Sequence, residues 1–284
     1  MKDLTYVLQN FFTHKDFLAP ASQIPGTLFT PLQFGFEAVL LAFILGYALY
    51  LSRHPEKIRR VFTGMWILLV IWEVLIIWWD STAGRVHALD YRQSLSFYPC
   101  SIFLYAVPLI LWGRGIWKQA ACGYIFTLGL LGALVNFLYP FSRLADYSCL
   151  SFPAFHTFFF HGSMLFTFFT MLFSGMHSYG DAQSFRDLLI PSLLSMIMSV
   201  PANLINYRIG ADYMYFRGKI FILANVFGRT PSPVITGILY VLYVAIPALF
   251  YLPGYLHNRG IAAEPEQELL PALPDLKFSW HFTD

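Results

Sequence analysis

Long apolar runs separated by short polar stretches dominate the chain. Seven segments of about 20 mainly apolar residues are long enough to cross a bilayer. They cover 34–52, 62–80, 94–112, 116–138, 153–176, 187–207 and 233–256. The pattern predicts an all-α polytopic membrane protein with seven transmembrane helices. We expect a membrane domain over 34–256, an amphipathic segment before it at 1–33, and a poorly ordered, Pro- and Glu-rich tail at 257–284.

Composition supports a membrane protein and excludes several other classes. Hydrophobic residues make up 57% of the chain and charged residues 12%, against about 25% charged residues in a soluble domain. The net charge is +2, and no basic run alternates with aromatic residues, so we expect no nucleic-acid partner. Three cysteines without a CxxC motif, and the lack of HExxH, predict neither a disulfide framework nor a metal site. We expect no organic cofactor.

The charges of the loops predict the orientation. The short loop after the first segment, "SRHPEKIRR", holds the densest basic cluster of the chain, and such clusters stay in the cytoplasm. We therefore expect the N-terminus outside and the C-terminus inside, in a bacterial plasma membrane. The loop at 208–232 opposes this assignment, because it would place Arg208, Arg217, Lys219 and Arg229 outside. The early segments usually dominate.

Polar side chains inside the membrane are costly and mark candidate sites. Cys100 is expected about two turns into segment 94–112, and His161 about two turns into segment 153–176, both counted from the outside. Segment 187–207 ends outside with Asn203, Asn206 and Tyr207. Threading the segments through a bilayer places a thiol, an imidazole and two amides at a similar depth on the extracytoplasmic side.

This set of side chains suits acyl transfer through cysteine. A thiolate is the nucleophile, and an apolar environment keeps thiols protonated, so Cys100 needs a base beside it. His161 is the candidate base and acid, and Asn203 or Asn206 would orient the imidazole or donate to the oxyanion. Asn203, Asn206 and Tyr207 share one helix face. Each residue also has an ordinary interpretation, since buried cysteines often only pack and amides often only join helices.

Glu73, His156 and Cys149 complete the polar set around the predicted site. Glu73 lies deep in segment 62–80 and would pair with His161 or with Arg92. His156 lies five residues before His161, about 140° round a helix, so we expect it at the membrane boundary and not at the same site. Cys149, in an outer loop, would inactivate Cys100 if the two formed a disulfide.

The loop at 208–232 follows the two asparagines directly. Its stretch "RIGADYMYFRGK" combines aromatic and basic residues suited to covering the mouth of a lipid site. The candidate substrate-binding residues are Arg92, Tyr213, Tyr215, Arg217 and Lys219. The basic side chains would hold lipid phosphates or only anchor to headgroups. In segment 116–138, "GLLGAL" (129–134) predicts a helix face that packs closely.

Three motifs in this order resemble the YwaF-like integral membrane proteins of bacteria. They are "SFYPC", "FPAFHTFFFHG" and "NYRIGADYMYFRGK", and the resemblance spans roughly residues 35–255. The same family includes the eukaryotic transmembrane acyltransferase of polyunsaturated ether phospholipids. The resemblance implies that Cys100 is the acyl-accepting nucleophile and that His161 is the histidine of the HG pair. The proline before Cys100 is displaced from its place in the family pattern, and Asp212 stands where the family usually has Asn.

The leading hypothesis is a membrane-embedded Cys–His acyltransferase. It would move a fatty acyl chain between phospholipid and lysophospholipid through a cysteine thioester, without coenzyme A. Two alternatives use the same residues: a transporter or binding protein for lipids or small solutes, and a lipid acyl-ester hydrolase in which water is the acceptor.

Overall fold

The computed structural model describes residues 2–92, 94–218 and 232–263, and in this part of the chain every regular element is a helix. Five helices are long and apolar enough to cross a membrane. They cover Pro31–Ser52, Pro55–Thr82, Gly115–Leu138, Phe185–Ile209 and Pro233–Gly260. These confirm five of the seven predicted segments.

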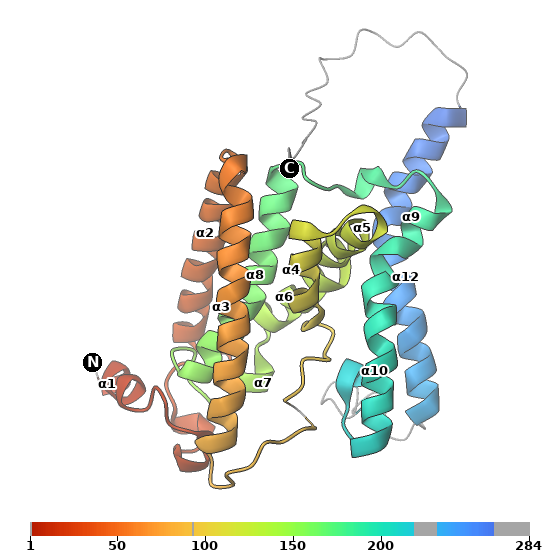
Figure 1. Cartoon of the computed structure of the whole chain (residues 1–284). Helices are drawn as coiled ribbons and strands as arrows, with labels where there is room; N and C mark the ends of the chain where they lie inside the picture. The colour runs from red at the N-terminus through yellow and green to blue at the C-terminus, as the bar shows by residue number, and fades with distance from the viewer. Residues whose placement is uncertain (1, 93, 219–231, 264–284) are drawn as a thin grey trace.

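The helices form three groups that lie side by side (Figure 1). The first group is α2 (Pro31–Ser52), α3 (Pro55–Thr82) and α8 (Phe152–Phe173). The middle group is α4 (Ile102–Trp112), α5 (Gly115–Tyr124) and α6 (Leu130–Leu138). The third group is α9 (Phe185–Leu189), α10 (Leu193–Ile209) and α12 (Ser232–Ala263). Short helices α1 (Lys2–Gln9) and α7 (Phe141–Leu144) lie at the lower end in Figure 1.

Short turns connect these helices. A π-helical turn, η3 (Ile125–Gly129), joins α5 to α6 into one continuous span. The 3₁₀ turns are η1 (Lys15–Phe17), η2 (Ala21–Gln23), η4 (Tyr179–Asp181), η5 (Ile190–Ser192) and η6 (Tyr213–Tyr215). Gly210 ends α10 in the left-handed conformation, at φ 71°, which glycine adopts without steric cost.

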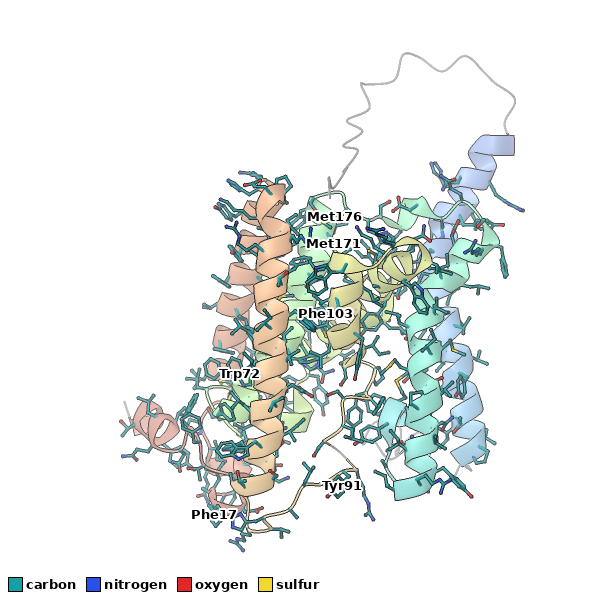
Figure 2. All side chains as sticks on the ribbon, viewed as in Figure 1. Phe17, Trp72, Tyr91, Phe103, Met171 and Met176 are labelled. Atoms are coloured by element: carbon teal, nitrogen blue, oxygen red, sulfur yellow. The ribbon has the colours of Figure 1, made fainter. Side chains whose placement is uncertain are left out.

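Helix α8 forms the centre of the bundle. It has the same 22-residue length as α2, and most of its side chains are buried between α2, α3, α6 and η3. Phe103 of α4 and Met171 of α8 point into this core (Figure 2) and are fully buried. By contrast, Val39 of α2 and Val241 of α12 are largely exposed, as expected of helix faces that contact lipid.

The predicted segment 94–112 differs from expectation. Its helix begins only at Ile102, so α4 has 11 residues and reaches about half way across a bilayer. Residues 83–92 and 94–101 instead lie outside any helix, mostly in bends and turns. Pro99 is one reason, because a proline disfavours the helical conformation of the residue before it, here Tyr98. The prediction that Cys100 lies two turns inside a helix is therefore wrong: it lies in a turn just before α4.

Both ends of the described chain carry helical structure. The N-terminal segment folds onto the lower end of the bundle, where the indole of Trp79 donates to the Phe12 carbonyl at 3.1 Å. At the other end, α12 continues to Ala263, so the first residues assigned to the tail are helical. The rest of the predicted tail lies outside the described residues.

Candidate functional site

A cavity of about 640 Å³ lies between α3, α6, α7, α8 and the segment 83–101. It is lined by polar side chains from all of these elements and from the N-terminal segment. The lining includes Cys100, His161, Glu73, His156, Asn136, Asp80, Arg143, Asp90, Lys15 and Tyr215. Such a volume is typical of a small-molecule site. The predicted thiol and imidazole therefore belong to the same cavity.

Cys100 is half-buried and lies against one face of α6. Gly132 comes so close that a Cβ atom there would lie 3.0 Å from the Cys100 sulfur. Asn136, one turn further along α6, donates from Nδ2 to the Cys100 Sγ at 3.8 Å and to the Gly132 carbonyl at 2.9 Å. This close approach confirms the prediction that the small residues of "GLLGAL" form a closely packed helix face.

The turn that carries Cys100 is fixed from α5. The hydroxyl of Tyr124, which is completely buried, donates to the Pro99 carbonyl at 2.7 Å and lies 3.3 Å from the Cys100 carbonyl. The backbone N–H of Phe103 donates to the same Cys100 carbonyl at 3.0 Å. Cys100 thus precedes the first turn of α4, where the helix dipole favours negative charge.

His161 faces the cavity from α8 with a defined tautomer. Its Nδ1 lies 2.9 Å from the Thr157 carbonyl, and since a carbonyl only accepts, Nδ1 carries the proton. Nε2 is then left with a lone pair and is able to accept a proton. No hydrogen bond joins Cys100 to His161 among the residues that the structure describes, so the two groups meet only through the cavity.

Glu73 pairs with His156, in contrast to the prediction that it pairs with His161 or Arg92. His156 Nε2 donates to Glu73 Oε2 at 2.9 Å, and the hydroxyl of Ser96 donates to Oε1 at 3.0 Å. The expectation that His156 lies away from the site is also wrong, because His156 and His161 both line the cavity. The cavity wraps round α8 widely enough to contact helix faces about 140° apart.

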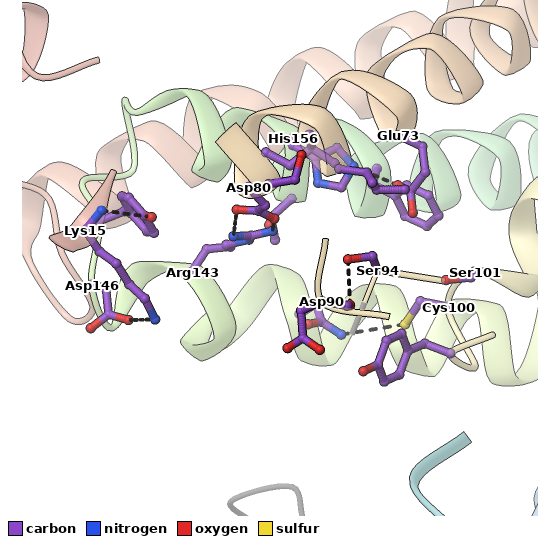
Figure 3. Close-up of a pocket in the computed structure, with 18 of the residues that line it drawn as sticks. Lys15, Glu73, Asp80, Asp90, Ser94, Cys100, Ser101, Arg143, Asp146 and His156 are labelled. Carbon is purple, nitrogen blue, oxygen red and sulfur yellow. Dashed lines mark hydrogen bonds and ion pairs between the residues drawn. The ribbon is translucent and has the colours of Figure 1, made fainter. Parts of the chain in front are cut away.

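Two ion pairs line the end of the cavity beside the N-terminal segment (Figure 3). Arg143 contacts both carboxylate oxygens of Asp80, at 3.2 and 2.8 Å, and Lys15 contacts Asp146 at 3.3 Å. The pattern of residues along the chain did not mark these side chains or Asn136 as candidates. A signal was present for Asn136, because threading 116–138 through the bilayer places it near the outer end of that segment.

The amides predicted from segment 187–207 do not line the cavity. Asn203 Nδ2 donates to the hydroxyl of Tyr240 on α12 at 3.2 Å. Asn206 is buried, and its side chain bonds both backbone groups of Tyr213, at 2.8 and 2.7 Å. Tyr207 is 86% exposed. These contacts join α10 to its neighbours, which is the ordinary role of amides between helices.

One of the predicted substrate-binding residues lines the cavity, and three others bond backbone carbonyls. Tyr215 lines the cavity. Arg92 donates to the Ile209 carbonyl at 3.1 Å and Arg217 to the Asn206 carbonyl at 3.5 Å, so both bond the last carbonyls of α10, a common use of basic side chains. The hydroxyl of Tyr213 donates to the Tyr91 carbonyl at 2.6 Å. Lys219 lies outside the described residues.

All three cysteines are free, so Cys100 and Cys149 do not form a disulfide. Cys149 is buried beside Gly26, and this burial raises the pKa of its thiol to about 11. Within residues 2–92, 94–218 and 232–263, no three His, Cys, Asp or Glu side chains come together as metal ligands.

The fold and the cavity define an integral membrane protein built from helices around a polar site. The model of the TMEM164 family matches residues 28–251, and the chain therefore belongs to the TMEM164 family, a transmembrane family. No curated protein and no solved structure matches the chain. The resemblance to the YwaF-like proteins and to the ether-lipid acyltransferase stays a prediction.

Proposed function

We propose that this protein is a membrane acyltransferase that uses Cys100 as nucleophile and His161 as base and acid. The observation that carries the proposal is the shared cavity: a thiol and a histidine with a free Nε2 line the same polar hollow. One further feature supports it: the Nδ1 proton of His161, directed at the Thr157 carbonyl, leaves Nε2 as the base. A buried thiol is mostly protonated, so Cys100 needs this base before it can attack.

The reaction has two steps, acylation of Cys100 and transfer of the acyl chain to a second lysophospholipid. His161 takes the thiol proton of Cys100, and the thiolate attacks the ester carbonyl of a phospholipid. The ester C–O bond breaks, His161 returns the proton to the leaving lysophospholipid, and a cysteine thioester remains. A second lysophospholipid then gives its hydroxyl proton to His161 and attacks the thioester. The C–S bond breaks, and His161 returns the proton to the Cys100 sulfur. Because the acyl donor is itself a phospholipid, no coenzyme A is required.

The missing hydrogen bond between Cys100 and His161 is compatible with this mechanism. Catalytic hydrogen bonds are often long in a site without substrate and shorten when substrate binds. Cys100 lies on a turn and not within a helix, so a rotation about its side-chain bond changes the direction of the sulfur without moving a helix.

We propose that the cavity opens on the extracytoplasmic side of a bacterial plasma membrane. Helix α3 runs from the basic cluster at its start to Asp80, which lines the cavity near its other end (Figure 1). The basic cluster and the cavity therefore lie at opposite ends of the bundle, and a cytoplasmic basic cluster leaves the cavity outside. Of the basic residues that oppose this assignment, Arg217 does so less strongly than a free charge, since it bonds the Asn206 carbonyl.

The test is an acyl adduct on the protein. Purified protein in detergent is incubated with a phospholipid and examined by intact mass, with hydroxylamine to release thioesters. We expect an adduct of one acyl chain that Cys100→Ala abolishes and that Cys122→Ser, a matched change of a cysteine outside the cavity, leaves intact. Added lysophospholipid should discharge the adduct and yield a new phospholipid.

Three outcomes would contradict the proposal. An adduct that appears equally in Cys100→Ala places the chemistry elsewhere. An adduct that discharges at the same rate with and without lysophospholipid indicates a hydrolase. The absence of an adduct with every phospholipid, together with lipid binding unaffected by Cys100→Ala, indicates a binding protein or transporter.

A further inference from the structure

Acyl transfer places negative charge on an oxygen, and the proposed Cys100–His161 pair does not account for that charge. When the thiolate attacks an ester, the carbonyl oxygen becomes an oxyanion that is bonded to the same carbon as the sulfur. Donors that lie beside this position before the reaction contribute the largest single effect in many such sites. The predicted donors, Asn203 and Asn206, bond other groups.

We propose that Asn136 is the oxyanion donor of this site, an inference that rests on the proposed function. Its Nδ2 lies 3.8 Å from the Cys100 sulfur, and both side chains line the cavity. The position of the oxyanion is separated from the sulfur by only two bonds, so an N–H group beside the sulfur also lies beside the oxyanion.

The Asn136 amide is held in place before the reaction. The side-chain amide has two N–H bonds. One donates to the Gly132 carbonyl at 2.9 Å, one turn earlier on α6, which fixes the plane of the amide. The other is directed at the sulfur. A donor that is already oriented needs no reorganisation when charge develops.

Gly132 permits this arrangement. Because Gly132 has no side chain, the Cys100 sulfur can lie close to α6. A Cβ atom at this position would be only 3.0 Å from the sulfur. A larger residue would push the sulfur away from the amide. Gly132 and Asn136 therefore act together: one admits the sulfur, and the other supplies the donor.

The experiment compares two reactions of the same thiol. Acylation by a phospholipid passes through an oxyanion, whereas alkylation by iodoacetamide does not, because it displaces iodide at a saturated carbon. In Asn136→Ala we expect acyl-adduct formation to fall about 100-fold. Alkylation of Cys100, followed by peptide mass spectrometry, should stay within about threefold, because it forms no oxyanion and loses only the long 3.8 Å contact between Asn136 and the sulfur.

A second variant removes the donor and keeps the helix contact. The hydroxyl of Asn136→Thr can donate its single hydrogen to the carbonyl one turn earlier, which leaves nothing to donate to an oxyanion. We expect the same loss of acylation with unchanged alkylation. Asn258→Ala is the matched control, since Asn258 bonds the Gly180 and Ala182 carbonyls away from the cavity, and both of its rates should equal those of the wild type.

The outcomes separate this inference from the proposed function. Acylation at the wild-type rate in both Asn136 variants overturns the inference and leaves the function standing. An equal fall in acylation and alkylation also overturns it, because Asn136 would then only position the thiol. No adduct in the wild-type protein overturns the function itself.

Discussion

Two hollows lie along α8, and they differ in chemistry. The cavity of about 640 Å³ is lined by Thr157 and His161 of α8 together with charged and amide side chains of other elements. The groove of about 320 Å³ is lined by α2, α3 and α8, with almost entirely apolar side chains such as Phe158 and Phe166. One helix thus presents a polar face to one hollow and an apolar face to the other.

The difference follows from the backbone around each hollow. Regular helices form every wall of the groove, so its backbone groups are satisfied and its side chains can be apolar. The cavity borders the non-helical residues 94–101 and also Tyr215, which has a positive φ of 60° next to Met214 at 54°. Non-helical backbone at membrane depth is tolerated where it is buried in protein or lines a polar cavity. Strain of this kind gathers at functional sites.

The largest expected effect is on stability at the Glu73–His156 pair. Glu73→Ala removes a carboxylate that bonds His156 and Ser96 and leaves the imidazole without its partner in a half-buried position. We expect the free energy of unfolding to fall by about 3 kcal/mol, measured by denaturant unfolding in detergent. Ser163→Ala, a polar residue of the groove, should change it by less than about 0.5 kcal/mol. If the two substitutions lowered the free energy of unfolding equally, the polar cavity and the apolar groove would not differ in how much their polar side chains stabilise the fold.

The next largest effect is expected from a matched pair of glycine substitutions, one beside the cavity and one beside the groove. In Gly132→Ala the new Cβ meets the Cys100 sulfur at 3.0 Å, whereas in Gly162→Ala it meets the Ile44 side chain at 3.3 Å, beside the groove. We expect Gly132→Ala to slow formation of the Cys100 acyl adduct about tenfold, because displacement of a reacting atom is costly. Gly162→Ala should leave the adduct rate unchanged, although it lies next to His161. A slower rate in Gly162→Ala alone would place the reactive side of α8 at the groove.

The smallest expected effect is at Asp16, which follows the cavity-lining residues His14 and Lys15 in the N-terminal segment. The backbone N–H of Arg85 donates to Asp16, and this hydrogen bond is the main cause that lowers the pKa of the Asp16 carboxyl. A carboxyl with a lowered pKa stabilises the folded state above its unfolded pKa of about 3.9, and this stabilisation disappears as the pH falls through the folded value.

Asp16→Asn should therefore lower the melting temperature slightly at pH 7, with a difference from the wild type that shrinks between about pH 5 and pH 2. The effect is small because the group is exposed and screened by salt. A difference that stays constant over this pH range would mean that the Asp16 charge contributes nothing to the fold.

The lengths of the apolar runs were sufficient to predict most of the long helices. Helices α2, α3, α8 and α12 coincide closely with predicted segments, because a helix in lipid must be long, apolar and internally hydrogen-bonded. The segment 94–112 failed for a physical reason: its apolar composition suits a protein interior as well as lipid. Tyr124, from helix α5, bonds the carbonyls of Pro99 and Cys100 and so holds the residues just before α4 as a turn.

The sequence by itself determined the class of protein and the tight packing at Gly132, since both depend on residue type and on distance along the chain. Only the tertiary structure decided which side chains meet. Threading a chain through a bilayer places residues by depth but does not fix the rotation about each helix axis, so it favoured Asn203 as a partner in the site and did not single out Asn136. The packing of α6 against the Cys100 turn directs Asn136 at the sulfur, while the packing of α10 against α12 commits Asn203 to Tyr240.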